Sequence, residues 1–354
     1  MRQHSSRYCA AIAAALTLAW AGQLEAAQAL AQNVPEIPME AVEGFIKLPE
    51  GLYLGEGIGV ATNSQGHVFV YTRSQDTRLF EFDEDGDYVR EIGAGLYGFE
   101  FAHKVRVDKD DNIWAVDEGS NQVIKFNPEG RVTMVLGYRP PAVAGAVAFG
   151  PSAFWGQSGG PGPDERYLFA RPTDVTWDTE GNIFVSDGYF NHRVVKYTPD
   201  GRYVGQVGTG QRGSGVDEFS TPHTIASDNQ GNIYVGDRGN RRVKVYNSDL
   251  VLQTMYEDVG APWEICISDG PHQYLFVSNS NSDSNPAASW DISGEVYKME
   301  LDGTIIGRFG EAGKAPGQFQ TIHGMACRNP NELIVAEISA WRVQKIRLAS
   351  EPVF

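Results

Sequence analysis

The sequence predicts an all-β protein, a six-bladed β-propeller, from three observations. The segments VDKDDNIWAVD, WDTEGNIFVSD and SDNQGNIYVGD each indicate two alternating strands joined by a turn rich in Asp, Asn and Gly. A third strand, a Pro/Asp-Gly turn and a fourth strand follow, as in HRVVKYTPDGRYVGQVG. Six such units recur at a spacing of about 40 to 70 residues, and four antiparallel strands per unit are typical of propeller blades.

The ends of the repeat indicate how the ring closes. The six units begin near Ile58, His103, Thr173, His223, Trp263 and His323. The last unit, residues 323–348, contains only three strands, so we expect residues 45–48 to supply its outermost strand. Residues 139–166 do not fit a blade, and they are interpreted as a loop inserted between the second and third blades.

The first residues predict export. Arg2 and Arg7 precede an apolar run over residues 8–21, and Ala29 and Ala31 place small residues where a signal peptidase cleaves. We therefore expect a signal peptide at 1–31, a propeller over 32–354, and a periplasmic or secreted protein. The apolar run is too short for a membrane anchor, so no membrane association is expected.

Composition adds two further expectations. The chain has 45 acidic against 29 basic residues, a formal net charge of −16, and such a surface repels nucleic acid. Two cysteines, Cys266 and Cys327, follow the leader. They fall one residue out of register when blades five and six are aligned, and neighbouring strand positions face opposite sides. We therefore expect no disulfide between them.

Three histidines share one column of the repeat. Alignment of the blades on the turn Asp or Asn puts His103, His223 and His323 at equivalent positions of blades two, four and six. Alternate blades of a six-fold ring are related by three-fold rotation, so these imidazoles would converge on the channel axis as a His₃ metal site. Zinc is the leading candidate, although iron, cobalt or manganese suit the same ligands. Alternatively, each histidine is satisfied by hydrogen bonds to the next blade.

Strand directions place further polar residues beside that column. The second strand of each blade returns to the face where the first began, which brings Arg73, Tyr189 and Arg238 near the histidines. The two arginines are candidates to bind a carboxylate, and Tyr189 is a candidate general base. Alternatively, the arginines pair with neighbouring acids and Tyr189 contributes packing.

Other residues of the repeat are assigned to its architecture. The acids that end second strands, Asp187 and Asp237, are expected to cap the loops that follow them. A basic residue recurs at the start of third strands and is also expected to be structural: Arg78, Arg193, Arg242 and Arg342.

The cadence GNIYVGDRGNRRVKVY resembles the NHL repeat, and the surrounding segments resemble the peptidyl-α-hydroxyglycine α-amidating lyases. This resemblance implies zinc bound by the histidines of FAHKV, STPHT and QTIHG, which are His103, His223 and His323. It also implies a catalytic tyrosine in SDGY, Tyr189, and active-site arginines in YTRS and GDRGN, Arg73 and Arg238. The family has an acid that helps to bind calcium after the third histidine. Gly324 stands there, so a structural calcium is doubtful.

The leading hypothesis is therefore a zinc-dependent lyase. Its substrate would be a small molecule or peptide with an α-hydroxyglycine-like end, cleaved at the N–C bond to an amide and glyoxylate. One alternative is a non-catalytic NHL propeller that serves as a binding scaffold, which predicts no tightly held metal. Another is a propeller hydrolase or lactonase, for which carboxylate and amide ligands around calcium would be expected instead of three histidines.

Overall fold

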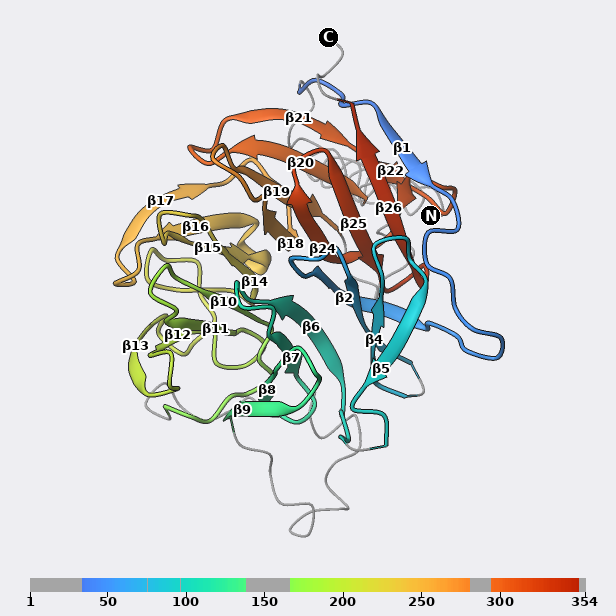
Figure 1. Ribbon diagram of the computed structural model, residues 1–354. Coiled ribbons are helices and arrows are strands. Elements are labelled where there is room, and N and C mark those ends of the chain that lie inside the picture. The colour runs from blue at the N-terminus through green and yellow to red at the C-terminus, as the bar shows by residue number, and fades with distance from the viewer. Residues whose placement is uncertain (1–33, 75, 96, 138–165, 281–293, 350–354) are drawn as a thin grey trace, which may run out of the picture.

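The computed structural model describes residues 34–74, 76–95, 97–137, 166–280 and 294–349. Over these ranges, six four-stranded antiparallel sheets surround a central axis (Figure 1). The innermost strands contact one another in the closed order β2, β6, β10, β14, β18, β24 and β2 again. The predicted six-bladed β-propeller is therefore confirmed.

The strands of the blades follow one another along the chain. Blade one contains β2 (Glu56–Thr62), β3 (Val68–Arg73), β4 (Arg78–Phe82) and β5 (Tyr88–Ile92). Blade two contains β6 (Ala102–Val107), β7 (Ile113–Asp117), β8 (Gln122–Phe126) and β9 (Val132–Gly137). Blade three contains β10 (Asp174–Trp177), β11 (Ile183–Asp187), β12 (Arg193–Tyr197) and β13 (Tyr203–Val207).

The second half of the chain completes the ring. Blade four contains β14 (Pro222–Ser227), β15 (Ile233–Asp237), β16 (Arg242–Tyr246) and β17 (Leu252–Tyr256). Blade five contains β18 (Pro262–Ile267), β19 (Tyr274–Asn279), β20 (Glu295–Glu300) and β21 (Ile305–Phe309). Blade six contains β24 (Ile322–Asn329), β25 (Glu332–Glu337), β26 (Arg342–Leu348) and β1 (Met39–Val42). Short strands β22 (Glu311–Ala312) and β23 (Gln318–Phe319) pair outside the blades, and η1 (Arg238–Asn240) is a 3₁₀ turn.

An N-terminal strand closes the ring, but the prediction of residues 45–48 for it is wrong. The strand is β1, which pairs with β26 so that Met39 faces Leu348 and Val42 faces Lys345. The chain then turns at Gly44, which has φ 61°, and Phe45 is buried between blades one and six. Phe45 passes so close to Gly86 that a Cβ there would lie 1.8 Å from the Phe45 carbonyl oxygen. The apolar residues after Gly44 pack between blades instead of joining a sheet.

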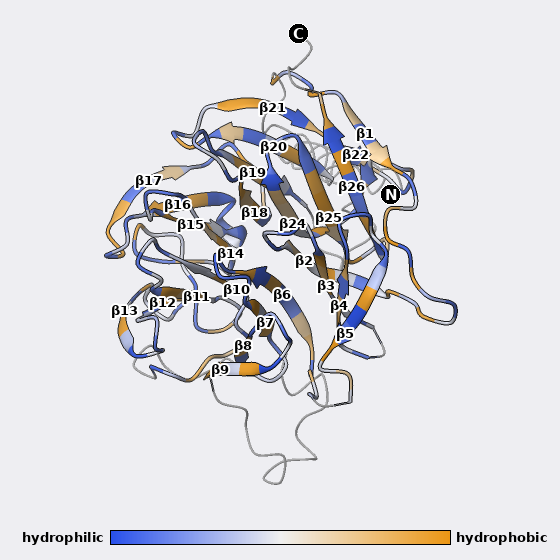
Figure 2. Cartoon of the chain, in the orientation of Figure 1, coloured by the Kyte–Doolittle hydropathy of each residue, from blue (hydrophilic) through white to orange (hydrophobic). Residues whose placement is uncertain are grey.

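Six apolar clusters hold the blades together, and each lies mainly between two neighbouring blades. Figure 2 shows that hydrophobic residues concentrate on the strands, whereas many of the connecting turns are hydrophilic. Because both faces of every blade are covered by neighbours, central strands such as β7, β11 and β15 are buried along their whole length.

Buried acids at the ends of second strands are structural, as predicted, but the backbone hydrogen bonds of Asp187 and Asp237 go to the loops before the innermost strands. From the loops that follow, the side chains of Asn191 and Asn240 bind them. Asp187 accepts hydrogen bonds from the Ala170 backbone N–H (2.8 Å) and from Arg193 Nε (3.0 Å). Asp237 binds the Ser220 N–H (2.7 Å) and Arg242 Nε (2.8 Å) in the same way. Each acid therefore ties the loop before an innermost strand to the blade, and the recurring arginine completes the contact.

The expectation about the cysteines is wrong, because Cys266 on β18 and Cys327 on β24 form a disulfide. A second bulge in β24, between Ala326 and Asn329, breaks the strand's alternation at Cys327. The Cys327 side chain consequently meets the neighbouring innermost strand, with the two Cα atoms 6.1 Å apart. The disulfide joins blades five and six at the centre of the ring.

Two sequence predictions fall outside the described residues. They are the signal peptide at 1–31 and nearly all of the inserted loop at 139–166. Within the part of the chain that the structure describes, no helix is long and apolar enough to cross a membrane.

We predict that the disulfide stabilises the ring. A Cys266→Ser/Cys327→Ser variant is expected to lose about 2–4 kcal/mol of unfolding free energy, because the cross-link restricts a loop with a sequence separation of 61 residues in the unfolded chain. Urea unfolding with and without a reducing agent measures this loss. The reductant should lower the midpoint of the wild type and leave that of the double variant unchanged. Equal midpoints for oxidised wild type and variant would contradict the prediction.

Candidate metal centre and catalytic cavity

A bulge at the same place of three innermost strands presents the histidines. Strand pairing is irregular between Ala102 and Lys104, between Pro222 and Thr224, and between Ile322 and Gly324. The residue between each pair is His103, His223 or His323, so each histidine is the extra residue of a bulge. A bulge re-aims its side chain away from the regular pleat, and here all three side chains turn to the channel. The column predicted from the repeat is confirmed as a spatial cluster.

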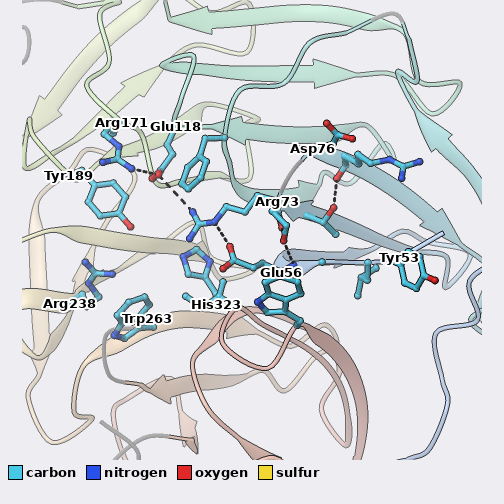
Figure 3. A pocket seen from close by; sticks show the side chains of 18 of the residues that line it. Tyr53, Glu56, Arg73, Asp76, Glu118, Arg171, Tyr189, Arg238, Trp263 and His323 are labelled. Carbon is cyan, nitrogen blue, oxygen red and sulfur yellow. Dashed lines mark hydrogen bonds and ion pairs between the residues drawn. The ribbon is translucent and has the colours of Figure 1, made fainter. Parts of the chain in front are cut away.

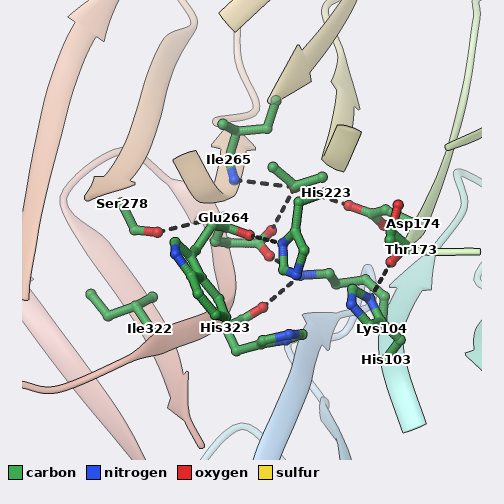
Figure 4. Close-up of polar contacts among 12 residues, drawn as sticks. His103, Lys104, Thr173, Asp174, His223, Glu264, Ile265, Ser278, Ile322 and His323 are labelled. Atoms are coloured by element: carbon green, nitrogen blue, oxygen red, sulfur yellow. Dashed lines mark hydrogen bonds and ion pairs between the residues drawn. The ribbon is translucent and has the colours of Figure 1, made fainter. Parts of the chain in front are cut away.

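Each histidine is fixed by a hydrogen bond to a backbone carbonyl of the next blade in the ring, as Figure 4 shows for His103 and Thr173. His103 Nδ1 lies 2.5 Å from the Thr173 carbonyl oxygen, His223 Nδ1 lies 2.7 Å from that of Trp263, and His323 Nδ1 lies 2.9 Å from that of Ile58. A carbonyl only accepts, so each Nδ1 donates and each Nε2 keeps its lone pair. The predicted alternative, satisfaction by the neighbouring blade, therefore accounts for only one nitrogen of each ring.

The remaining nitrogens converge. One ring nitrogen of each histidine lies within 4.8 Å of its counterparts on the other two, and the ring centroids are 4.7 to 4.9 Å apart. All three side chains are buried, and burial lowers their pKa values well below the usual value, so the imidazoles are neutral. Neutral imidazoles oriented through Nδ1 by carbonyls are ligands that suit a divalent transition metal such as zinc.

A charge network that the sequence analysis missed fills the channel beside the histidines. The Lys104 ammonium binds the Glu264 carboxylate and the His323 carbonyl oxygen, the latter at 2.5 Å. Arg106 bridges Glu264 (2.7 Å) and Asp174 (2.9 Å). Lys104, Asp174 and Glu264 each follow the aligned position of their blade by one residue, so the repeat alignment already places these three groups in one column, and only Arg106 lies at another offset. Two cations and two carboxylates thus balance one another and hold the backbone at His323.

Gly324 follows the third histidine where the backbone of blade one passes closely. A Cβ at this position would lie 2.8 Å from the Val60 backbone nitrogen and 2.9 Å from Gly59 Cα. Such contacts are closer than side chains ordinarily make, so the packing of β2 against β24 requires glycine at this position.

A cavity of about 1050 Å³ opens beside the histidine cluster, and His323 is the histidine that lines it (Figure 3). Its wall includes all three residues predicted from strand direction: Arg73, Tyr189 and Arg238. The Tyr189 hydroxyl lies 3.1 Å from His103 Nε2 and 3.3 Å from His223 Nε2. Burial, followed by the nearby Glu118 carboxylate, raises the pKa of Tyr189, while Arg238 and two other arginines act in the opposite direction.

The two predicted arginines differ in their partners. Arg73 Nε binds Glu56 at 2.8 Å, and its guanidinium stacks 4.0 Å from the centre of the Phe101 ring. Arg238 stacks 4.2 Å from the Trp263 ring and 5.6 Å from the Tyr189 ring. Its buried Nη1 has no hydrogen-bond partner among the described residues. Arg238 is therefore the better placed of the two to bind an anion.

Two further cavity residues were not predicted to have a role. Glu118 follows the end of β7, and its carboxylate binds the Arg171 guanidinium. Arg171 also lies 4.9 Å from the centre of the Tyr189 ring. Two signals in the sequence could have found them. The strand-direction argument that selected Tyr189 also places Glu118 on this face, and Arg171 carries the opposite charge. A charged residue beside a recurring Asp is not distinctive enough in one sequence to be selected.

The repeat is also recognised by comparison with known proteins. A family model described as "NHL repeat" matches residues 219–246, which cover β14 to β16. A virginiamycin B lyase from Staphylococcus aureus shares the fold, with a TM-score of 0.53 and 12% identity over 89% of this chain and all of that chain. Fold and repeat together define an NHL-repeat β-propeller.

The resemblance to amidating lyases is confirmed as well. A probable peptidyl-alpha-hydroxyglycine alpha-amidating lyase of Caenorhabditis elegans is 25% identical over 329 residues, which cover 83% of both chains. The peptidylglycine alpha-amidating monooxygenase of Rattus norvegicus is 28% identical over 61% of this chain, but the match spans only 21% of that protein. These similarities support a lyase-like enzyme.

We predict that the histidine cluster makes the metal-free protein acid-sensitive. Because folding lowers the pKa of each histidine, the unfolded chain binds more protons below about pH 6.5, and stability is lost as the pH falls. Each histidine contributes a slope of up to about 1.4 kcal/mol per pH unit. Urea unfolding between pH 7.5 and 5 measures the slope, which should be smaller in His223→Gln. Identical slopes in wild type and variant would contradict the prediction.

Proposed function

We propose that this chain is a zinc-dependent lyase that cleaves the N–C bond of a peptidyl- or N-acyl-α-hydroxyglycine to an amide and glyoxylate. One observation carries the proposal. Three neutral imidazoles with converging nitrogens lie beside one cavity, which His323 lines. The same cavity is lined by Tyr189, whose hydroxyl is within hydrogen-bond distance of the other two imidazoles, and by Arg238, whose Nη1 has no hydrogen-bond partner among the described residues. The similarity to named lyases supports the same reaction class.

Each of these residues has a separate role in the proposed reaction. A divalent ion held by His103, His223 and His323 would supply Lewis acidity toward the substrate oxygens. Arg238 binds the carboxylate of the hydroxyglycine end, since its guanidinium offers a planar pair of donors. Tyr189 accepts the proton of the α-hydroxyl group as the phenolate, a form that the positive charge of a bound ion and of Arg238 would favour against the effect of burial. The electron pair of the broken O–H bond then forms the aldehyde C=O of glyoxylate, the C–N bond breaks, and its pair goes to nitrogen, which takes up a proton.

We also propose that the protein acts in the periplasm or after secretion. The pattern of Arg2, Arg7 and the apolar run over residues 8–21 supports export. The disulfide between Cys266 and Cys327 adds support, because disulfides persist in oxidising compartments.

Two variants test the roles of the tyrosine and the histidines. Tyr189→Phe should keep its zinc and fold but lose glyoxylate release from an N-acyl-α-hydroxyglycine by about 10²- to 10⁴-fold, the usual loss when a general base is removed. His223→Ala should lose both metal and activity. Glyoxylate formation and metal content are measured on the same samples.

The same experiment separates the proposal from its alternatives. Full activity in Tyr189→Phe would eliminate Tyr189 as the base. A metal-loaded wild type that is inert toward several acyl chains would refute the lyase assignment while leaving the metal site standing. A wild type without tightly bound metal or glyoxylate release would favour a binding scaffold.

A third variant tests the carboxylate contact. Arg238→Met should raise KM by about 10- to 100-fold, which corresponds to the loss of hydrogen bonds to a charged group, with unchanged zinc content. Arg78→Met is the matched control. Arg78 also lines the cavity but is paired with Glu91 at 3.0 Å, so its loss should leave KM nearly unchanged. Equal effects of the two substitutions would refute the assignment of Arg238.

A further inference from the structure

The cavity contains a buried carboxylate oxygen that the proposed reaction does not yet use. Glu118 is only 1% exposed, and its Oε2 has no hydrogen-bond partner among the described residues. This oxygen lies 3.7 Å from His103 Nε2, and Glu118 lines the same cavity as Tyr189 (Figure 3). A buried oxygen that bears charge costs free energy unless a donor reaches it. A ligand in the cavity is placed to supply that donor.

The other oxygen of the carboxylate is already committed. Glu118 Oε1 accepts a hydrogen bond from Arg171, and Arg73 Nη1 lies 3.9 Å from it. These two cations sit on the Oε1 side and fix the orientation of the group. Oε2 is therefore held in a defined place. It can still accept a hydrogen bond, although the charge of the Glu118 carboxylate is already balanced by Arg171.

The substrate proposed above has two hydrogen-bond donors near the reacting carbon, its α-hydroxyl group and its amide N–H. Tyr189 takes the hydroxyl proton, and Arg238 takes the carboxylate. The amide N–H is then the only donor left without a partner, and Glu118 Oε2 is the acceptor left without one. This matching rests on the proposed function.

The geometry points to Glu118 as a specificity-determining residue, whose Oε2 accepts a hydrogen bond from the N–H of an N-acyl substrate. It selects amides over the corresponding O-acyl esters, which replace the N–H donor with an oxygen acceptor. Such an ester oxygen would face the carboxylate oxygen and leave both without a donor.

Two unreactive ligands isolate this contact. N-benzoylglycine and O-benzoylglycolate differ only in N–H against O, and neither has the α-hydroxyl group that the reaction needs. Isothermal titration calorimetry should show the wild type binding the amide on the order of 10- to 100-fold more tightly than the ester, as expected for a hydrogen bond to a charged group.

Glu118→Gln should remove this preference or turn it toward the ester. Arg171 holds an acceptor, so the glutamine places its carbonyl oxygen there and its NH₂ group where Oε2 was. The ratio of the two affinities is the readout, because loss of a negative charge strengthens binding of both anionic ligands alike. Glu56→Gln removes another carboxylate that lines the cavity and should leave the ratio unchanged. Thermal unfolding and zinc content are measured on the same samples.

Each outcome bears on a different claim. A ratio unchanged by Glu118→Gln would overturn the assignment and leave Glu118 as the counter-ion of Arg171, with the proposed function intact. Loss of zinc in this variant would also overturn it and identify Glu118 as a metal ligand. Failure of both ligands to bind the wild type would overturn this inference, whereas the proposed function stands or falls on glyoxylate release from several N-acyl-α-hydroxyglycines.

Discussion

The candidate site depends on one repeated interaction, the hydrogen bond from a bulged histidine Nδ1 to a backbone carbonyl across a blade interface. This bond fixes the tautomer, and with it the nitrogen that faces the axis. The carbonyls belong to Thr173, Trp263 and Ile58, the members of the same column in the intervening blades. The geometry of the three imidazoles is therefore a direct consequence of how the blades pack, and a shift between blades would move a ligand.

Blade six illustrates this dependence, because it carries His323 and contains both the first and the last strand of the described residues, β1 and β26. It is held in place by the pairing of β1 with β26, by the disulfide to blade five, and by the bond from Lys104 in blade two to the His323 carbonyl oxygen. A ring has no edge once it is closed. These three links stabilise the blade at which closure occurs.

Charge is distributed unevenly between the surface and the site. The chain as a whole is acidic, with a net charge of −16, yet the cavity gathers three arginines around Tyr189. Arg73 is paired with Glu56 and Arg171 is paired with Glu118, whereas Arg238 Nη1 has no hydrogen-bond partner among the described residues. The paired cations shape the cavity and position the acids. The unpaired donor of Arg238 suits a single carboxylate.

The sequence by itself determined the blade count and the histidine column, because a repeat with fixed turns specifies equivalent positions in a ring. It also selected Arg73, Tyr189 and Arg238, since strand direction decides which ends share a face. Only the tertiary structure decided the closing strand, the disulfide and the pairing of Glu118 with Arg171. The first depends on how Phe45 packs between blades, and the second on a bulge at Cys327. The third depends on contacts between side chains 53 residues apart, which no local periodicity encodes.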